Sequence, residues 1–95
     1  MAAVTIFYQT FCPYCRMAKR AVEALRAESP ACAAVDITWV EETRHRALAD
    51  RYDYWYVPSV YLGEEKLYEA DPAQGYEEIK AGLRAALERA REAGA

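Results

Sequence analysis

Short runs of apolar residues, several of them alternating with polar ones, mark four segments of the chain. Residues 4–8 form the first run and residues 34–40 the second. A period of two is typical of a strand with one buried face. Two further runs, 59–62 and 66–70, are separated by a short turn that contains Gly63, which predicts a β-hairpin.

Apolar residues recur at steps of three and four in three other segments, as expected for amphipathic helices. The first segment opens at Pro13 and ends at Ser29-Pro30, the second is short and covers about 47–52, and the third covers 76–93. The order of elements predicts one α/β domain over residues 1–95, in which three helices flank a four-stranded mixed sheet.

Composition narrows the classes of function. The chain has 95 residues, with 12 Lys and Arg interleaved with 15 Asp and Glu. It therefore has no basic field that would hold a phosphate backbone. The strand pattern begins by Val4, which leaves no room for a signal segment, and no apolar run approaches the roughly 20 residues of a spanning helix. We expect a cytoplasmic protein that binds neither nucleic acid nor membranes.

Two cysteines directly follow the first predicted strand. The segment Cys12-Pro13-Tyr14-Cys15 places both sulfurs on the first turn of the first helix, close enough to form and reopen a disulfide. Proline at the first helical position makes Cys12 the N-cap, where the free amides of the helix stabilise a thiolate. Because a lasting structural disulfide is unusual in the cytoplasm, this pair predicts a redox site.

Cys32 and His45 are the remaining candidates for chemistry. We interpret Cys32 as a small apolar residue and His45, in the polar opening of the second helix, as a surface residue. Together with Cys12 and Cys15 they are four ligands of the kind that zinc prefers, so a structural zinc module is an alternative. Cys32 and His45 lack the close spacing of a ligand pair in a zinc ribbon, and we expect no metal.

The segment Cys12-Pro13-Tyr14-Cys15, combined with Tyr56-Val57-Pro58 before the third strand, resembles the glutaredoxin branch of the thioredoxin-like fold. The resemblance covers most of the chain, in the right order and at suitable spacing. It implies a thioredoxin-like α/β fold and a thiol-disulfide oxidoreductase. In that reaction Cys12 attacks the substrate disulfide and Cys15 resolves the mixed disulfide.

The resemblance also assigns roles around the dithiol. Pro13 and Tyr14 form the active-site turn. Val57-Pro58 is expected to be a cis peptide bond beside the dithiol, with the backbone of Val57 free to pair with an extended substrate. Thioredoxins carry a buried aspartate where this chain has Ile6. We therefore expect no acid or base of the thioredoxin type beneath the site, and proton transfer through water or the partner.

Departures from the glutaredoxin pattern concern glutathione. Glutathione-using members commonly have a lysine three residues before the first cysteine, a threonine before Val-Pro, and a Gly-Gly pair followed by an aspartate. This chain has Gln9 in place of the lysine, Tyr56 in place of the threonine and Tyr68-Glu69 in place of the Gly-Gly pair. Only Asp71 is a loose match, to the aspartate. Glutathione carries two carboxylates, so the loss of a cation and the gain of an acidic residue beside the site weaken its binding. The bulk of Tyr56 and Tyr68 narrows or reshapes the groove that would hold glutathione.

These departures favour protein disulfides as substrates. The expected substrate-binding residues are Gln9, Tyr56, Val57, Pro58 and Asp71. No cofactor is expected to bind tightly, and the electron donor is either glutathione or a thioredoxin-reductase-like partner. A glutaredoxin-type carrier of a [2Fe-2S] cluster, held by the first cysteine and glutathione, is a further alternative.

The aromatic residues Tyr54, Trp55, Tyr56 and Tyr61 have two interpretations. They form either a recognition surface beside the dithiol or packing between a helix and the sheet. For Tyr61, inside a predicted strand, we favour packing.

Overall fold

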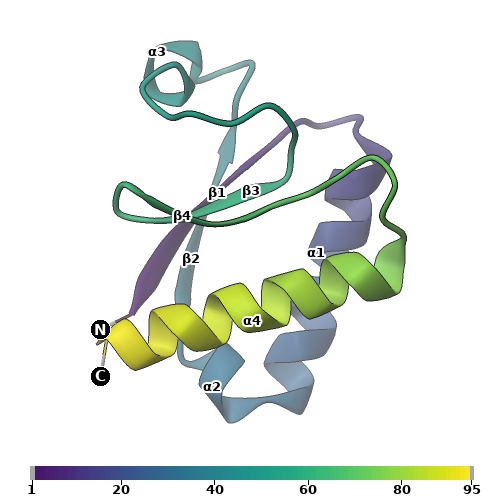
Figure 1. Ribbon diagram of the computed structural model, residues 1–95, viewed down its shortest axis with the longest axis vertical. Coiled ribbons are helices and arrows are strands. Elements are labelled where there is room, and N and C mark those ends of the chain that lie inside the picture. The colour runs from purple at the N-terminus through teal and green to yellow at the C-terminus, as the bar shows by residue number, and fades with distance from the viewer. Residues whose placement is uncertain (1, 95) are drawn as a thin grey trace.

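Four strands form one mixed sheet in the order β2-β1-β3-β4 (Figure 1). The computed structural model describes residues 2–94. The strands are β1 (Ala3–Tyr8), β2 (Asp36–Glu41), β3 (Ser59–Leu62) and β4 (Glu65–Glu69). β1 runs parallel to β2 and antiparallel to β3, and β3 and β4 form the hairpin. The predicted four-stranded mixed sheet is confirmed.

The helices number four within residues 2–94, one more than expected: α1 (Pro13–Glu28), α2 (Pro30–Ala33), α3 (Arg46–Ala49) and α4 (Tyr76–Gly94). The additional helix is α2, because Ser29 both ends one helix and begins the next. The backbone N–H of Ser29 donates to the Leu25 carbonyl (2.8 Å), and the hydroxyl of Ser29 accepts from the backbone N–H of Cys32 (3.2 Å). Cys32 thus lies on a helix and is wholly buried.

The sheet separates two apolar clusters, because successive residues of β1 point to opposite faces. Ile6 packs against α1 and α4 in the larger cluster, which includes Leu25, Leu83 and Leu87. α4 lies beside α1 and covers this face of the sheet as predicted (Figure 1). Phe7 belongs to the smaller cluster on the other face, with residues of α3 and of the loop that follows it.

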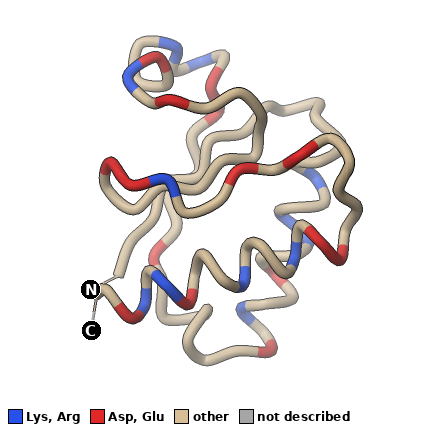
Figure 2. Tube along the Cα trace, viewed as in Figure 1, with Lys and Arg blue, Asp and Glu red and all other residues tan. Residues whose placement is uncertain are grey.

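Lys and Arg positions are interspersed with Asp and Glu positions along the chain (Figure 2). Glu28 of α1 pairs with Lys80 (2.7 Å) and Arg84 (3.1 Å) of α4, so these charges fasten the two helices to each other. Exposed pairs of this kind are screened by solvent and contribute little to stability. Among residues 2–94, no helix is both long and apolar enough to cross a membrane.

Candidate active site

The dithiol lies where β1 ends and α1 begins. Pro13 occupies the first turn of α1, and Cys12 is the N-cap, with an extended backbone. The backbone N–H of Cys15 donates to Sγ of Cys12 (3.4 Å). The sequence prediction of a sulfur at the helix N-terminus is confirmed, and the positive end of the helix faces this sulfur.

The two cysteines differ in burial. Cys12 is partly exposed, whereas Cys15 is 2% exposed; both are free thiols. Sγ of Cys15 accepts a hydrogen bond from the backbone N–H of Gln9 (3.5 Å). Burial is the main cause that raises the pKa of Cys15 to about 12, and the neighbouring Cys12 and Glu42 raise it further. Cys15 is therefore a neutral thiol at physiological pH.

Alkylation of the reduced protein tests this difference. At pH 7.5, one equivalent of iodoacetamide adds rapidly to Cys12, while Cys15 and the buried Cys32 react only after unfolding in guanidinium, because a buried thiol supplies almost no thiolate. Peptide mapping by mass spectrometry identifies the modified sulfur. Rapid labelling of Cys15 in the folded protein would contradict this assignment.

Val57-Pro58 is a cis peptide bond, as predicted. The thiol of Cys12 points at the carbonyl oxygen of Val57 (3.9 Å), which places this segment beside the dithiol. Three exposed aromatic residues lie next to these two segments in the sequence: Phe11 (88%) directly precedes Cys12, and Trp55 (87%) and Tyr56 (52%) directly precede Val57. We call these three residues the aromatic rim.

A carboxylate of β4 fixes part of the aromatic rim. The backbone N–H groups of Trp55 and Tyr56 both donate to Oε2 of Glu69 (2.6 and 2.7 Å). The other oxygen of Glu69 pairs with Lys66 (2.7 Å). Trp55 and Tyr56 of the rim therefore lie on an anchored loop. Tyr54 and Tyr61, in contrast, pack against Phe7, so packing is the correct interpretation for these two.

A very small cavity separates the active-site turn from the residues that follow β4. It measures about 30 Å³ and is lined by Tyr14, Tyr56, Val57, Ala70, Asp71 and Pro72. The hydroxyl of Tyr14 donates to the carbonyl of Pro72 (3.0 Å) and bridges these segments. This space is large enough for a water molecule but too small for the tripeptide glutathione.

Tyr68 does not narrow this groove, so that expectation was wrong. Its ring lies against Gly82 of α4, where an added Cβ would clash, and its hydroxyl donates to Gln74 (2.6 Å). Tyr56 is the aromatic residue that lines the cavity. Strand residues alternate in direction, and the irregular register between β3 and β4 decides which side Tyr68 takes.

Ile6 is buried at the position where thioredoxins carry an aspartate, but two glutamates at the end of β2 lie near the loop that leads to the dithiol. β1 and β2 are parallel and pair Tyr8 with Glu41, so their carboxyl ends meet. Glu42 accepts hydrogen bonds from the side-chain amide of Gln9 and from the hydroxyl of Tyr54 (2.5 Å). Two consecutive glutamates after a strand parallel to the dithiol strand are the signal that sequence reasoning missed.

Glu41 holds the loop that leads to Cys12. Its carboxylate accepts from the hydroxyl (2.5 Å) and backbone N–H (2.6 Å) of Thr43. It also accepts from the hydroxyl (2.8 Å) and backbone N–H (3.0 Å) of Thr10. These bonds, that of the Thr43 hydroxyl first, lower the pKa of Glu41 from 4.5 to about 2.

Replacement of Glu41 by glutamine should make stability less dependent on pH. A lowered pKa stabilises the fold above the ordinary pKa of the carboxyl, and this contribution disappears as the pH falls from about 4.5 to about 2. We expect Glu41→Gln to be less stable than the parent at pH 7 and equally stable near pH 2, by urea unfolding. The exposed Glu92→Gln is the control, and a constant difference across this range would contradict the assignment.

Comparison with known proteins agrees with this geometry. The family model described as Glutaredoxin matches residues 4–67, more than half of the chain. The chain belongs to the glutaredoxin family. No curated protein matches the sequence closely enough to count as a relative.

Solved structures show the same fold around this glutaredoxin-family site. One similar structure, described as that of a malarial protein, has 15% identity and a TM-score of 0.61, covering 88% of this chain and 94% of the other. Another is a mutant thioredoxin from Halobacterium salinarum. It has 21% identity and a TM-score of 0.59, covering 92% of this chain and 75% of the other. The thioredoxin-like fold is therefore confirmed.

The zinc alternative finds no support in this glutaredoxin-family structure. In residues 2–94, no three His, Cys, Asp or Glu side chains are grouped as metal ligands would be. Cys32 lies in the core, and His45 is an exposed residue that precedes α3. The fold separates these two residues from the dithiol, so the surface interpretation of His45 is correct.

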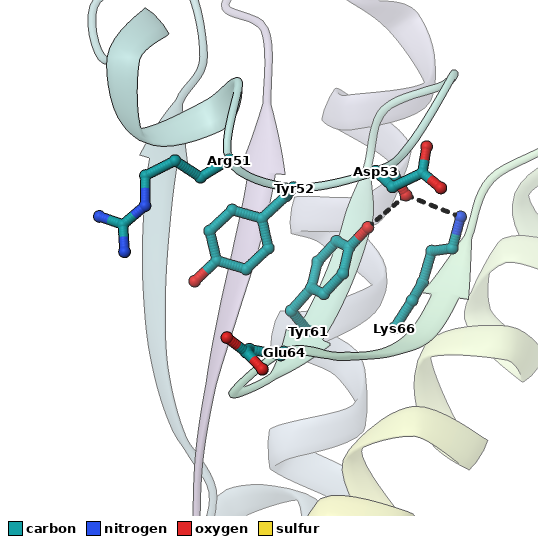
Figure 3. A pocket seen from close by; sticks show the side chains of 6 residues that line it. All are labelled: Arg51, Tyr52, Asp53, Tyr61, Glu64 and Lys66. Atoms are coloured by element: carbon teal, nitrogen blue, oxygen red, sulfur yellow. Dashed lines mark hydrogen bonds between the residues drawn. The ribbon is translucent and has the colours of Figure 1, made fainter.

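A larger cavity lies on the face of the sheet that α3 covers (Figure 3). It measures about 390 Å³ and is lined by Arg51, Tyr52, Asp53, Tyr61, Glu64 and Lys66. The hydroxyl of Tyr61 (2.6 Å) and the ammonium of Lys66 (3.0 Å) both donate to the carbonyl of Asp53 (Figure 3). None of the predicted site residues lines this cavity.

Proposed function

We propose that this protein is a thiol-disulfide oxidoreductase that reduces protein disulfides through Cys12 and Cys15. The unequal burial of the two thiols at the start of α1 carries the proposal. An accessible sulfur at a helix N-terminus is suited to attack a substrate disulfide. A buried neutral thiol one turn later is suited to resolve the mixed disulfide that forms.

The proposed reaction has two exchange steps. The Cys12 thiolate attacks one sulfur of the substrate disulfide; a Cys12-substrate bond forms and the other substrate sulfur leaves with the electron pair. Cys15 then loses its proton to water and attacks Cys12, and the substrate's remaining sulfur leaves as a thiolate that takes up a proton. The substrate gains two electrons and two protons, and Cys12 and Cys15 end as a disulfide.

The aromatic rim supports a protein substrate. Phe11, Trp55 and Tyr56 are exposed in the two segments that meet at Cys12 and Val57, and aromatic side chains are prominent in protein recognition. In the described residues, no hydrogen bond uses the backbone N–H of Val57, so this group is available to an extended segment. We assign Val57 and Tyr56 to the contact with that segment, next to Pro58 and Asp71.

The surroundings of Cys12 argue against glutathione as the preferred donor. The cavity beside Tyr56 has a volume of only about 30 Å³, and the side chain of Gln9 is engaged with Glu42. We therefore propose that a protein reductase of the thioredoxin-reductase class recharges the dithiol in the cytoplasm, where thiols are kept reduced. The weak glutathione site also disfavours the iron-sulfur carrier.

Equilibration in glutathione redox buffers tests the proposal, with intact-mass detection of each species and Cys15→Ser measured alongside. We expect a Cys12–Cys15 disulfide with a potential below about −230 mV and little glutathione adduct on Cys12. Tyr56→Thr, which opens the small cavity, should increase the adduct, and Tyr76→Phe is the matched control outside that cavity.

Each outcome decides a different part of the proposal. A potential of about −200 to −230 mV with a ready adduct would make glutathione the donor and leave the reductase activity intact. Absence of any Cys12–Cys15 disulfide would overturn the activity itself. A coloured, dimeric protein that releases iron on acidification would favour the cluster carrier instead.

A further inference from the structure

One edge of the sheet lacks the features that usually guard a sheet edge. In the order β2-β1-β3-β4, the outer strands are β2 and β4. An edge presents N–H and C=O groups that another strand can bind, so proteins guard it with charges, proline or a bulge. β4 contains Glu65, Lys66 and Glu69, and its register with β3 is irregular. β2 pairs with β1 without interruption, contains no proline and has charged residues only at its two ends.

The backbone of β2 decides which residues face this open edge. The backbone N–H of Asp36 donates to the carbonyl of Ala2, just before β1 (2.9 Å). Successive residues of a strand direct their backbone groups to opposite sides. Ile37 and Trp39 therefore direct both their N–H and their C=O groups away from β1, and no loop or turn of the described chain bonds to them.

The outward carbonyls on either side of these two residues are already bonded. That of Val35 accepts from the guanidinium of Arg26 (2.7 Å). That of Glu41 accepts two backbone N–H groups of the loop that follows β2 (3.2 Å each). A strand added at this edge therefore forms its hydrogen bonds with Ile37 and Trp39, and this restriction fixes its register.

We propose that the strand added here is β2 of a second copy of this chain, antiparallel to the first, with the two-fold axis at Thr38. Ile37 of each copy then lies opposite Trp39 of the other, and each such pair exchanges both of its backbone hydrogen bonds. Every free backbone group of Ile37 and Trp39 is used in both copies. The two four-stranded sheets become one continuous sheet.

The side chains of β2 complement themselves in this register. Ile37 and Trp39 both pack toward the larger cluster, so each isoleucine lies beside a tryptophan of the other copy. On the opposite face Thr38 meets its own counterpart. Aromatic–β-branched pairs and Thr–Thr pairs both stabilise neighbouring strands. Asp36 lies opposite Val40, so no two like charges of β2 are directly opposed.

The neighbouring symmetric registers lack this match. A shift of two residues in one direction places Ile37 opposite its own counterpart and Trp39 opposite Val35. A shift in the other direction places Trp39 opposite its counterpart and Ile37 opposite Glu41. Each shift requires an outward carbonyl that the chain already bonds. The symmetric register at Thr38 uses only free groups, and this self-complementarity favours a second copy over an unrelated strand.

A groove beside the edge has room for the side chains of the second copy. It lies between α1 and β2, has a volume of about 610 Å³, and is lined in part by Val22, Ile37 and Trp39. Ile37 and Trp39 are only half-buried, so pairing would cover apolar surface that one copy leaves open. The charged residues of the lining are Lys19, Arg26, Glu23 and Asp36. Their charges sum to zero and do not oppose a second copy.

A cysteine at the proposed axis tests the register. The background is Cys12→Ser with Cys15→Ser, so that the dithiol does not interfere. Thr38→Cys then places two sulfurs at a non-hydrogen-bonded pair, whose Cα atoms are about 4.5 Å apart, within reach of a disulfide. Asp36→Cys is the matched control: it is also exposed on the same face, but its two copies are more than about 13 Å apart in this register. We expect mild oxidation to link Thr38→Cys chains about tenfold faster or more.

Sedimentation of the parent protein under reducing conditions gives a second readout. The average mass should rise from monomer toward dimer between about 10 μM and about 1 mM, because an interface of this size is weak. Thr38→Lys opposes two like charges at the axis and should raise the dissociation constant about tenfold or more. Ala81→Lys adds the same charge at an exposed position of α4 and should follow the parent curve.

Three results would overturn the proposal. Linking of Asp36→Cys as fast as Thr38→Cys would contradict the register. A parent that stays monomeric at the highest concentration would exclude the second copy, even if an extended peptide binds to β2. Thr38→Lys that associates like the parent would remove the axis from Thr38.

The proposed reductase activity does not depend on this pairing. Glu41, at the carboxyl end of β2, holds the loop that leads to Cys12. Because the two β2 strands run antiparallel, the two dithiols lie toward opposite ends of the paired strands, and each remains open to its own substrate. Loss of pairing in Thr38→Lys should therefore leave the rate of disulfide reduction per chain unchanged.

Discussion

Cys12→Ser is expected to reduce disulfide-reductase activity to the uncatalysed background, a loss of about 10³-fold or more, because serine cannot form the attacking thiolate. Cys15→Ser should behave differently: it lacks the resolving thiol but retains Cys12 at the helix N-terminus. This variant should accumulate a stable mixed disulfide with a protein substrate, visible as an added mass that dithiothreitol removes.

Cys32→Ser serves as the control for both variants, since Cys32 is buried away from the dithiol on α2. Its specific activity per folded molecule should match that of the parent, although its stability falls. Equal activity losses in Cys12→Ser and Cys32→Ser would contradict the assignment of Cys12 as the attacking thiol. Trapping by Cys12→Ser instead of Cys15→Ser would reverse the two roles.

Phe7→Ala is expected to cost about 3–5 kcal/mol of folding free energy, the usual effect of removing a buried aromatic ring. Phe7 is wholly buried, and its ring contacts those of Tyr52 (4.8 Å), Tyr54 (5.3 Å) and Tyr61 (5.9 Å). A domain of this size has about 5–15 kcal/mol in total, so the variant should be close to unfolding.

Phe11→Ala is a matched control for this prediction. It removes the same side chain from a position that is 88% exposed, so its free energy of unfolding in urea should stay within about 0.5 kcal/mol of the parent. Because Phe11 belongs to the aromatic rim, the same variant should weaken reduction of protein disulfides more than that of a small disulfide. A loss of stability in Phe7→Ala as small as that expected for Phe11→Ala would show that the smaller cluster does not depend on Phe7.

Local patterns predicted the strands and the long helices because a strand or helix with one buried face imposes a short period on the sequence. α2 was missed for a physical reason: a four-residue helix has no full period, and Ser29-Pro30 signals a helix end and a helix start equally well. Trp55 was left undecided between packing and recognition, and only the path of the loop exposes it.

The sequence by itself determined the dithiol, because every part of it is local. Cys12, Pro13 and Cys15 lie within one helical turn, and the preference of proline for that turn sets the N-cap. The pairing of this turn with Val57-Pro58 came from resemblance to a family pattern, and the fold bears out their contact.

Tertiary structure alone decided what surrounds the dithiol. Gln9 meets Glu42 across 33 residues of sequence, and Tyr14 meets Pro72 across 58. Such contacts depend on strand order, on register and on which face each side chain takes, and a shift of one residue along a strand reverses that face. The burial that keeps Cys15 neutral likewise arises only in the folded chain, because solvent exclusion is a property of the assembled structure.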